Sequence, residues 1–490
     1  MIPFAPWVPD QADLNINVSK NVSGVLPLPN GYGPWRTFSP YATALSEAPL
    51  GAAITRREDG TRHVWCGTTI DLLKLNRSTL AFDDVSRTVG GSYACGANDR
   101  WNFIQFGTTL IAHNSADVTQ SIDIEAGTNF AALAGSPPQA KYGAVVGEFV
   151  MLGNLASAPN KLHWSAINDS TGWTVGTSQS DTQEFPDGGA VTGVVGGETG
   201  LVFQEECVRR LTYIGDPLIF QIDKIEDKRG LKAPFSIARM GTAVFYYSPE
   251  GFAVISTGGN ESRLLGTDQN GQSTINEWFV TDSDASKVNN IRGIADPLRS
   301  RVFWLYKSSN TANTFDSLLC YSVTDGRWTV SRGNFTELCV AATAGYTLDN
   351  MNALGTLETL TVSLDDPSLK GDVPSLAAFN GAYRLGFFSG TNQEATIETG
   401  EVELVPGRRA FVRGFKPHVD TATCYVSVGS RRVPSDMPTY SGESQPHSET
   451  GIAPFRVDSR YHRFKVRIPS GTAWTKAIGG DPTFVPTGGR

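Results

Sequence analysis

The chain has 490 residues, of which 40 % are hydrophobic and only 18 % are charged, and it contains 51 glycines. This composition is sufficient for two or three domains with sizeable cores and favours turn-rich β structure over helix. The net charge of −8 is uneven, because residues 401–490 carry +5 and the first 400 residues carry −13. This distribution argues against a protein that wraps DNA with its whole surface.

The first 50 residues contain many prolines and few runs long enough to form a strand. Such a segment cannot bury a core of its own, so we expect residues 1–50 to form an extended N-terminal arm across the body or a neighbouring molecule. Its start has no basic region before an apolar stretch, and no run of about 18 apolar residues occurs anywhere. The sequence therefore predicts no signal peptide, no stable membrane insertion and folding in a reducing cytoplasm.

A weak repeat with an average spacing of about 48 residues begins at Gly51. The first strands of its units are expected near Ile54, Ile104, Val145, Val194, Ile237 and Ile294. Each unit contains three or four short runs of apolar residues, as the blades of a β-propeller do. We therefore predict an all-β protein with a β-propeller of six blades over residues 51–335. An array of β-sandwiches with chance spacing is the alternative.

The stretch from Leu201 to Tyr306 carries the clearest strand signals. In Val244–Ile255, two apolar runs flank the turn Ser248–Gly251, whose proline and glycine suit the two halves of a tight turn. A short helix is expected at Thr274–Phe279, where the spacing of a threonine and a glutamate matches a capping box. Nothing in this stretch gathers a nucleophile, a base and an acid, which indicates a scaffold.

The region 336–400 predicts strands at Cys339–Tyr346 and Tyr383–Phe388, separated by a loop at Leu364–Ser375. It is interpreted as a blade extension or a connecting region. Residues 401–490 predict a separate C-terminal β-sandwich-like domain, with clear strands at Ala410–Phe415 and Tyr461–Ile468.

The last of these strands alternates strictly. Apolar side chains point one way, and the basic side chains of Arg463, Lys465 and Arg467 point the other. A solvated strand face explains this pattern without any function. The functional hypothesis is that the three basic residues dock on an acidic partner or on a DNA backbone.

No motif predicts a catalytic, cofactor-binding or metal site. The glycines from Gly193 to Gly200 match neither a dinucleotide fingerprint nor a phosphate-binding loop, and the spacing after Asp268 does not fit a calcium loop. The six cysteines form no CxxC pair, which predicts buried reduced thiols. The six histidines form no HxH or HxxxH pair.

Several segments together resemble one protein family. They include LPNGYGPWRTFSPY near the N-terminus, LHWSAINDSTGW at 162–173, CVRRLTYIGDPLIFQIDKI at 207–225, FYYSPEGFAVIS at 245–256 and RYHRFKVRIP near the end. In this order they resemble the tail nozzle proteins of short-tailed bacteriophages, also called packaged-DNA stabilisation proteins. Residues 333–400 contribute least to the resemblance.

The resemblance implies a structural virion protein made in the bacterial host cytoplasm. It implies a homohexamer around the tail axis that retains packaged phage DNA and passes it during ejection. The implied partners are a connector or adaptor ring, a tail needle or plug, and tail spikes or fibres. It implies no catalytic residue, so we expect no enzyme. The alternatives are a carbohydrate- or receptor-binding propeller of a phage tail, a propeller glycoside hydrolase and a non-viral scaffold.

Overall fold

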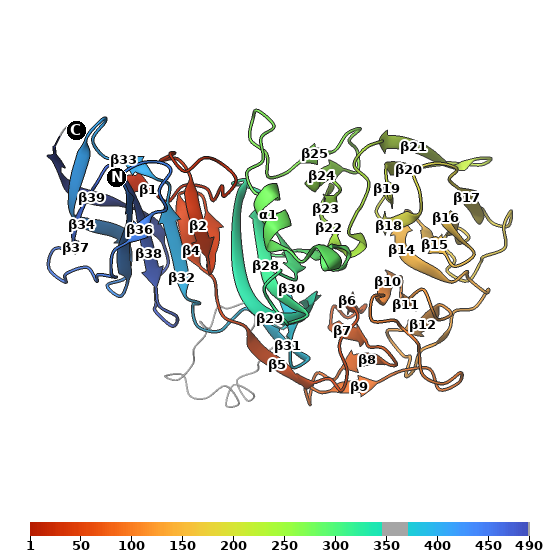
Figure 1. Ribbon diagram of the computed structural model, residues 1–490. Helices are drawn as coiled ribbons and strands as arrows, with labels where there is room; N and C mark the ends of the chain where they lie inside the picture. The colour runs from red at the N-terminus through yellow and green to blue at the C-terminus, as the bar shows by residue number, and fades with distance from the viewer. Residues whose placement is uncertain (345–370, 489–490) are drawn as a thin grey trace.

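The computed structural model describes residues 1–344 and 371–488, which are almost entirely β-strands and turns. Within these residues, seven four-stranded antiparallel blades surround an axis, five as separate sheets and two within a 13-stranded sheet, and a two-sheet sandwich lies beside the ring (Figure 1). In Figure 1 the sheets follow one another from β6–β9 at the bottom, through β14–β17 on the right, to β22–β25 at the top. The predicted all-β fold, a propeller with a C-terminal β-sandwich-like domain, is confirmed.

The first six blades correspond to the six predicted repeats, because each expected residue lies within the first strand of its blade or directly beside it. Blade 1 comprises β6 (Ala52–Arg56), β7 (Arg62–Gly67), β8 (Leu72–Leu75) and β9 (Phe82–Asp84). Blade 2 comprises β10 (Asn102–Phe106), β11 (Thr109–His113), β12 (Gln120–Asp123) and β13 (Ala131–Ala132). Blade 3 comprises β14 (Ala140–Val146), β15 (Phe149–Leu155), β16 (Ala158–Trp164) and β17 (Asp181–Glu184). Blade 4 comprises β18 (Val191–Val195), β19 (Gly200–Gln204), β20 (Val208–Gly215) and β21 (Ile219–Glu226). Blade 5 comprises β22 (Ala238–Met240), β23 (Ala243–Ser248), β24 (Gly251–Ser256) and β25 (Arg263–Leu264). Blade 6 comprises β26 (Arg292–Ala295), β27 (Arg301–Tyr306), β28 (Phe315–Ser322) and β29 (Arg327–Ala341).

The seventh blade is assembled from two remote parts of the chain. The first half of β29 is the outer strand of blade 6, and its second half pairs with β30 (Ser375–Asn380) to begin blade 7. The sheet continues through β31 (Arg384–Phe387) to β5 (Ser39–Ala44), which belongs to the N-terminal segment. The predicted number of six blades was one too low, because no contiguous repeat marks a blade that is built this way.

Hydrophobic clusters close the ring. Among the described residues, one cluster of buried side chains fills each of the seven interfaces between neighbouring blades. At the closing interface, Cys66 and Leu73 of blade 1 share a cluster with Cys339 and Phe379 of blade 7 and with Ala42 of β5. A closed ring covers the faces of its sheets and limits exposed strand edges, which makes the fold rigid and protects it from edge-to-edge association.

The sandwich has strands from both ends of the chain. One sheet contains β1 (Ile2–Pro3), β3 (Val25–Leu28), β4 (Gly31–Pro34), β34 (Arg409–Val419), β37 (Ala453–Ser459) and β39 (Ala477–Thr487). The other contains β2 (Ser19–Ser23), β32 (Ala395–Thr399), β33 (Val402–Glu403), β35 (Tyr425–Arg431), β36 (Thr439–Tyr440) and β38 (Tyr461–Ile468). Phe415 and Phe464 stack between the sheets, with ring centroids 4.4 Å apart. Strand β2 also pairs with β29, so blade 6 and the sandwich share one continuous sheet.

The N-terminal segment is extended, as predicted, but it lies on its own chain and is built into both domains. Strands β1 to β4 belong to the sandwich and β5 belongs to the propeller. The region 336–400 is divided in the same way, because β30 and β31 complete blade 7 whereas β32 belongs to the sandwich. The predicted loop 364–375 lies mostly outside the described residues, as does the end of the predicted strand 339–346.

The N-terminal segment also caps the helix on the propeller. Helix α1 (Asn276–Asp282) lies close to the predicted position, but the expected capping box does not form. Instead, the Asp10 carboxylate accepts hydrogen bonds from the backbone N–H groups of Glu277 and Trp278, at 2.9 and 2.8 Å. This remote carboxylate satisfies N–H groups that have no partner within the first turn of the helix.

Candidate docking site

The basic residues predicted on β38 alternate with buried apolar residues, as expected, but they do not form a free surface. Val466 and Ile468 are buried in the sandwich core, as the alternation predicted. Arg463, however, is only 7 % exposed. Its guanidinium lies 3.2 Å from the carboxylate of Asp13 and 3.3 Å from that of Glu401. Burial alone would raise the pKa of Asp13, but Arg463 and Lys20 outweigh it and lower that pKa.

The other two basic residues of β38 also find partners within the chain. Arg467 makes two hydrogen bonds to Glu443, at 2.8 and 2.7 Å, and lies 3.1 Å from Glu394. The hydrogen bond to Glu443 raises the pKa of Arg467. Lys465 lies over the ring of Tyr440, at 5.9 Å. Carboxylates therefore pair with Arg463 and Arg467 within the chain, and the docking hypothesis for Arg463, Lys465 and Arg467 stays a prediction.

The outer face of the other sandwich sheet carries basic residues that sequence reasoning did not single out. Arg413 on β34 and Arg456 on β37 are both exposed and lie beside the paired residues Val412 and Val457. Their neighbours Val412 and Phe455 are buried in the core, so the two arginines point outward. Within residues 1–344 and 371–488, neither makes a salt bridge. Arg413, Arg456 and the neighbouring Lys416 are called the basic face below.

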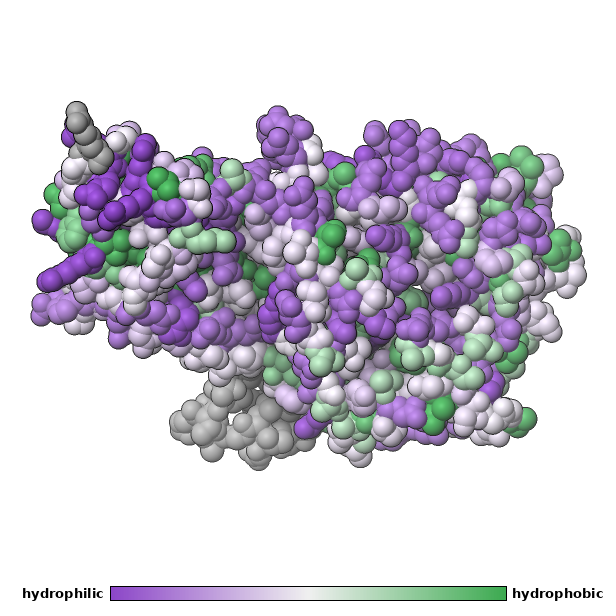
Figure 2. Space-filling view, in the orientation of Figure 1, coloured by the Kyte–Doolittle hydropathy of each residue, from purple (hydrophilic) through white to green (hydrophobic). Residues whose placement is uncertain are grey.

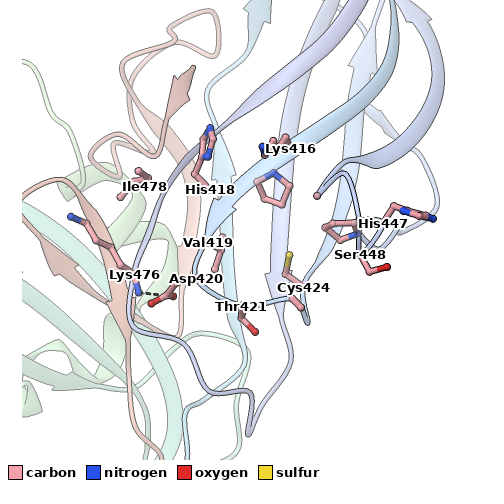
Figure 3. A pocket seen from close by; sticks show the side chains of 14 residues that line it. Lys416, His418, Val419, Asp420, Thr421, Cys424, His447, Ser448, Lys476 and Ile478 are labelled. Carbon is pink, nitrogen blue, oxygen red and sulfur yellow. Dashed lines mark hydrogen bonds between the residues drawn. The ribbon is translucent and has the colours of Figure 1, made fainter.

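The basic face continues into a groove at the edge of the sandwich (Figure 3). The groove has a volume of about 550 Å³ and is lined by Lys416, His418 and Lys476 among others. Its Asp420 carboxylate is already occupied, because it accepts hydrogen bonds from the backbone N–H groups of Thr475 and Lys476, at 2.9 and 3.0 Å. Burial opposes ionisation of Asp420, but these hydrogen bonds prevail and its pKa is lowered.

Arg413 and Arg456 lie on adjacent strands without a salt bridge, and like charges on neighbouring strands repel each other. An anionic partner on the basic face would relieve this repulsion, and its binding would weaken as salt is added. Figure 2 shows mostly polar side chains on the face in view, with apolar residues only in small separate areas. Charge is the feature of the basic face that suits it to docking on an anionic partner.

A buried ion cluster joins side chains from three parts of the propeller. Glu337 on β29 is fully buried, and its carboxylate bonds to the guanidinium groups of Arg100 and Arg292. Arg100 lies two residues before the first strand of blade 2 and Arg292 begins blade 6, so one carboxylate of blade 7 contacts side chains from three blades. Burial lowers the pKa of Arg292 to about 10, although Glu337 acts in the opposite direction. The sequence signal was a single acidic residue inside the apolar strand from Phe335 to Ala341.

Comparison with known proteins leaves the family open. No protein family matches the sequence, and no curated protein matches it. Similar solved structures include BamB from Moraxella catarrhalis, with 12 % identity and a TM-score of 0.35 over 74 % of this chain and 92 % of that one. The Pan2 WD40 domain of Neurospora crassa has 7 % identity and a TM-score of 0.37, over 70 % of this chain and 88 % of that one. A fungal alcohol oxidase of the AA5 family, in complex with copper, has 9 % identity and a TM-score of 0.42, over 93 % of this chain and 99 % of that one.

These likenesses are too weak to carry an argument, so the class of protein follows from the strand pairing. The chain is a β-propeller protein with a β-sandwich fused to it through shared N-terminal strands. Among the described residues, no cluster of His, Cys, Asp or Glu side chains has the grouping of a metal site. No described helix has the length and apolar character needed to span a membrane.

Proposed function

We propose that this protein is a structural component of a short phage tail, a nozzle whose copies form a ring around the path of the DNA. The carrying observation is that the N-terminal segment joins both domains into one body. It supplies strands to the sandwich, caps α1 and completes blade 7. A body whose described domains share one continuous sheet suits a part that transmits load, and the resemblance of five sequence segments to nozzle proteins points to the same role.

The DNA path in this proposal lies between copies, not through one propeller. The cavity near the propeller axis that is lined by Asn102, Gly143 and Gly193 has a volume of only about 190 Å³. A nucleic-acid duplex is far larger, so a conduit needs several copies arranged around a common axis. A head-to-tail contact that is repeated by rotation closes into such a ring.

Charge complementarity supports such a contact. Residues 401–490 carry +5 and the first 400 residues carry −13. The basic face of one copy would dock on the acidic propeller of the next copy, and connector, needle and fibre proteins would bind the remaining surfaces. The mostly acidic body would let DNA pass without holding it tightly. The protein acts in the virion and catalyses no reaction in this proposal.

Charge reversal on the basic face tests the proposal. The double variant Arg413→Glu, Arg456→Glu should remain folded, because both side chains are exposed and unpaired. We expect it to form at least tenfold fewer rings than the natural protein, counted by native mass spectrometry with the connector protein present. Arg56→Glu, at an exposed arginine of the propeller, is the matched control. Normal ring formation by the double variant would exclude the basic face as the contact.

A further inference from the structure

A second cavity opens at one end of the propeller axis and has no role in the proposed assembly. Its volume is about 760 Å³, which lies in the range of ligand pockets. It is lined from blades 3, 4 and 5 and from the connections between blades, including η1 (Pro234–Ser236) and η2 (Ala285–Asn290). Tyr142 and Phe235 form its floor and also line the smaller axial cavity beneath it.

Three lysines from different segments converge on this cavity. Lys141 lies in the inner strand of blade 3, Lys232 precedes η1 and Lys287 lies in η2. In the part of the chain that the structure describes, none of them has a salt-bridge partner. Glu205 is the single carboxylate among the lining residues. The lining therefore has an excess of positive charge that is available to a ligand.

Neutral hydrogen-bonding side chains outnumber these cations in the lining. They are Asn98, Asn154, Thr192, Ser286, Asn289 and Asn290. The Thr192 hydroxyl is buried and has no hydrogen-bond partner, and an orphaned buried polar atom in a cavity wall is costly unless a ligand satisfies it. Below the lysines, Phe235 has Arg100 against its ring at 4.9 Å and Tyr142 at 6.1 Å, so the floor is aromatic and held in place.

We propose that this axial cavity binds a short acidic saccharide. The three ammonium groups would bind its carboxylates, the asparagine amides and Thr192 would bind its hydroxyl groups, and the aromatic floor would contact the apolar faces of its rings. The many neutral polar groups and few cations favour a ligand with many hydroxyl groups and few charges. An acidic peptide has the opposite balance, and inorganic phosphate would leave most of the cavity unfilled.

Calorimetric titration of the whole chain with trigalacturonate tests this assignment. We expect saturable binding to the natural protein and at least tenfold weaker binding to the triple variant Lys141→Gln, Lys232→Gln, Lys287→Gln. Lys161→Gln, at a lysine outside the cavity, should bind as the natural protein does. Thr192→Val keeps every charge and should weaken binding severalfold, so the hydroxyl contact is tested even if the triple variant folds poorly.

Three further probes separate the ligand classes. Neutral trigalactose, a triglutamate peptide and inorganic phosphate should each bind at least tenfold more weakly than trigalacturonate. Equal binding of the peptide or of phosphate would overturn the assignment to a saccharide. Absent binding of trigalacturonate, or binding unchanged in the triple variant, would overturn the site itself. The variant with Arg413→Glu and Arg456→Glu should bind normally, which separates this site from ring assembly.

Discussion

Replacing Glu337 by glutamine tests the ion cluster that connects blades 2, 6 and 7. The substitution keeps the shape of the side chain but leaves the guanidinium groups of Arg100 and Arg292 near the axis without a counter-charge. Removal of one member of a buried ion pair costs about 3–5 kcal/mol, because the remaining charge stays desolvated. For a propeller of roughly 320 described residues, the unfolding entropy is near 0.7 kcal/mol per kelvin. The variant should therefore unfold about 4–7 °C below the natural protein.

Differential scanning calorimetry at pH 7 measures this shift. Glu148→Gln is the matched control, since Glu148 is exposed and makes no salt bridge among the described residues. Its unfolding temperature should change by less than about 1 °C. An equally small change in Glu337→Gln would show that the cluster does not hold the blades together, and the assignment of Glu337 as the link between three blades would be refuted.

Three further predictions follow from buried groups and from ring closure. Removal of residues 1–44, which deletes β5 and four sandwich strands, should give insoluble protein. The control Leu14→Ser, at an exposed position, should stay soluble. A soluble, folded truncation would contradict closure of the propeller ring by β5. Burial lowers the pKa of His113 to about 4. The contribution of His113 to the free energy of unfolding should therefore fall by up to roughly 3 kcal/mol as the pH drops from about 6.5 to 4, and should not change with pH above about 6.5. His113→Gln should reduce this pH dependence of stability in denaturant titrations. All six cysteines are free and buried, and burial raises the pKa of Cys95 and of Cys320 to about 12; a thiol reagent should label none in the native protein and six after unfolding.

Much of the propeller could be predicted because its signals are local. Alternating apolar residues, tight turns and a recurring unit length place β6, β10, β14, β18, β22 and β26 at or beside their expected residues. The hairpin from β23 to β24 follows from the proline and glycine of its turn. Blade 7 could not be predicted, since its outer strand, Ser39–Ala44, is remote in the sequence from the strands with which it forms the sheet. A proline-rich segment also gives no sign of which remote strands it will pair with.

The basic residues of the sandwich show the same limit of prediction from sequence. The alternation on β38 correctly predicts that Arg463, Lys465 and Arg467 share a face. Whether that face is free depends on Asp13 and Glu443, which the fold brings from distant segments. Arg413 and Arg456 form the unpaired surface instead, and the alternation around Arg456 does not show that this arginine lacks a carboxylate partner. Sequence pattern fixes the direction of a side chain, whereas its charge partners depend on tertiary structure.

Electron cryomicroscopy of the purified chain together with the connector ring tests the central claim most directly. We expect a closed ring of identical copies, with the sandwich of each copy against the propeller of the next and a central opening wide enough for a DNA duplex. A chain that stays monomeric with the connector present, or a ring whose copies meet through other surfaces, would contradict it.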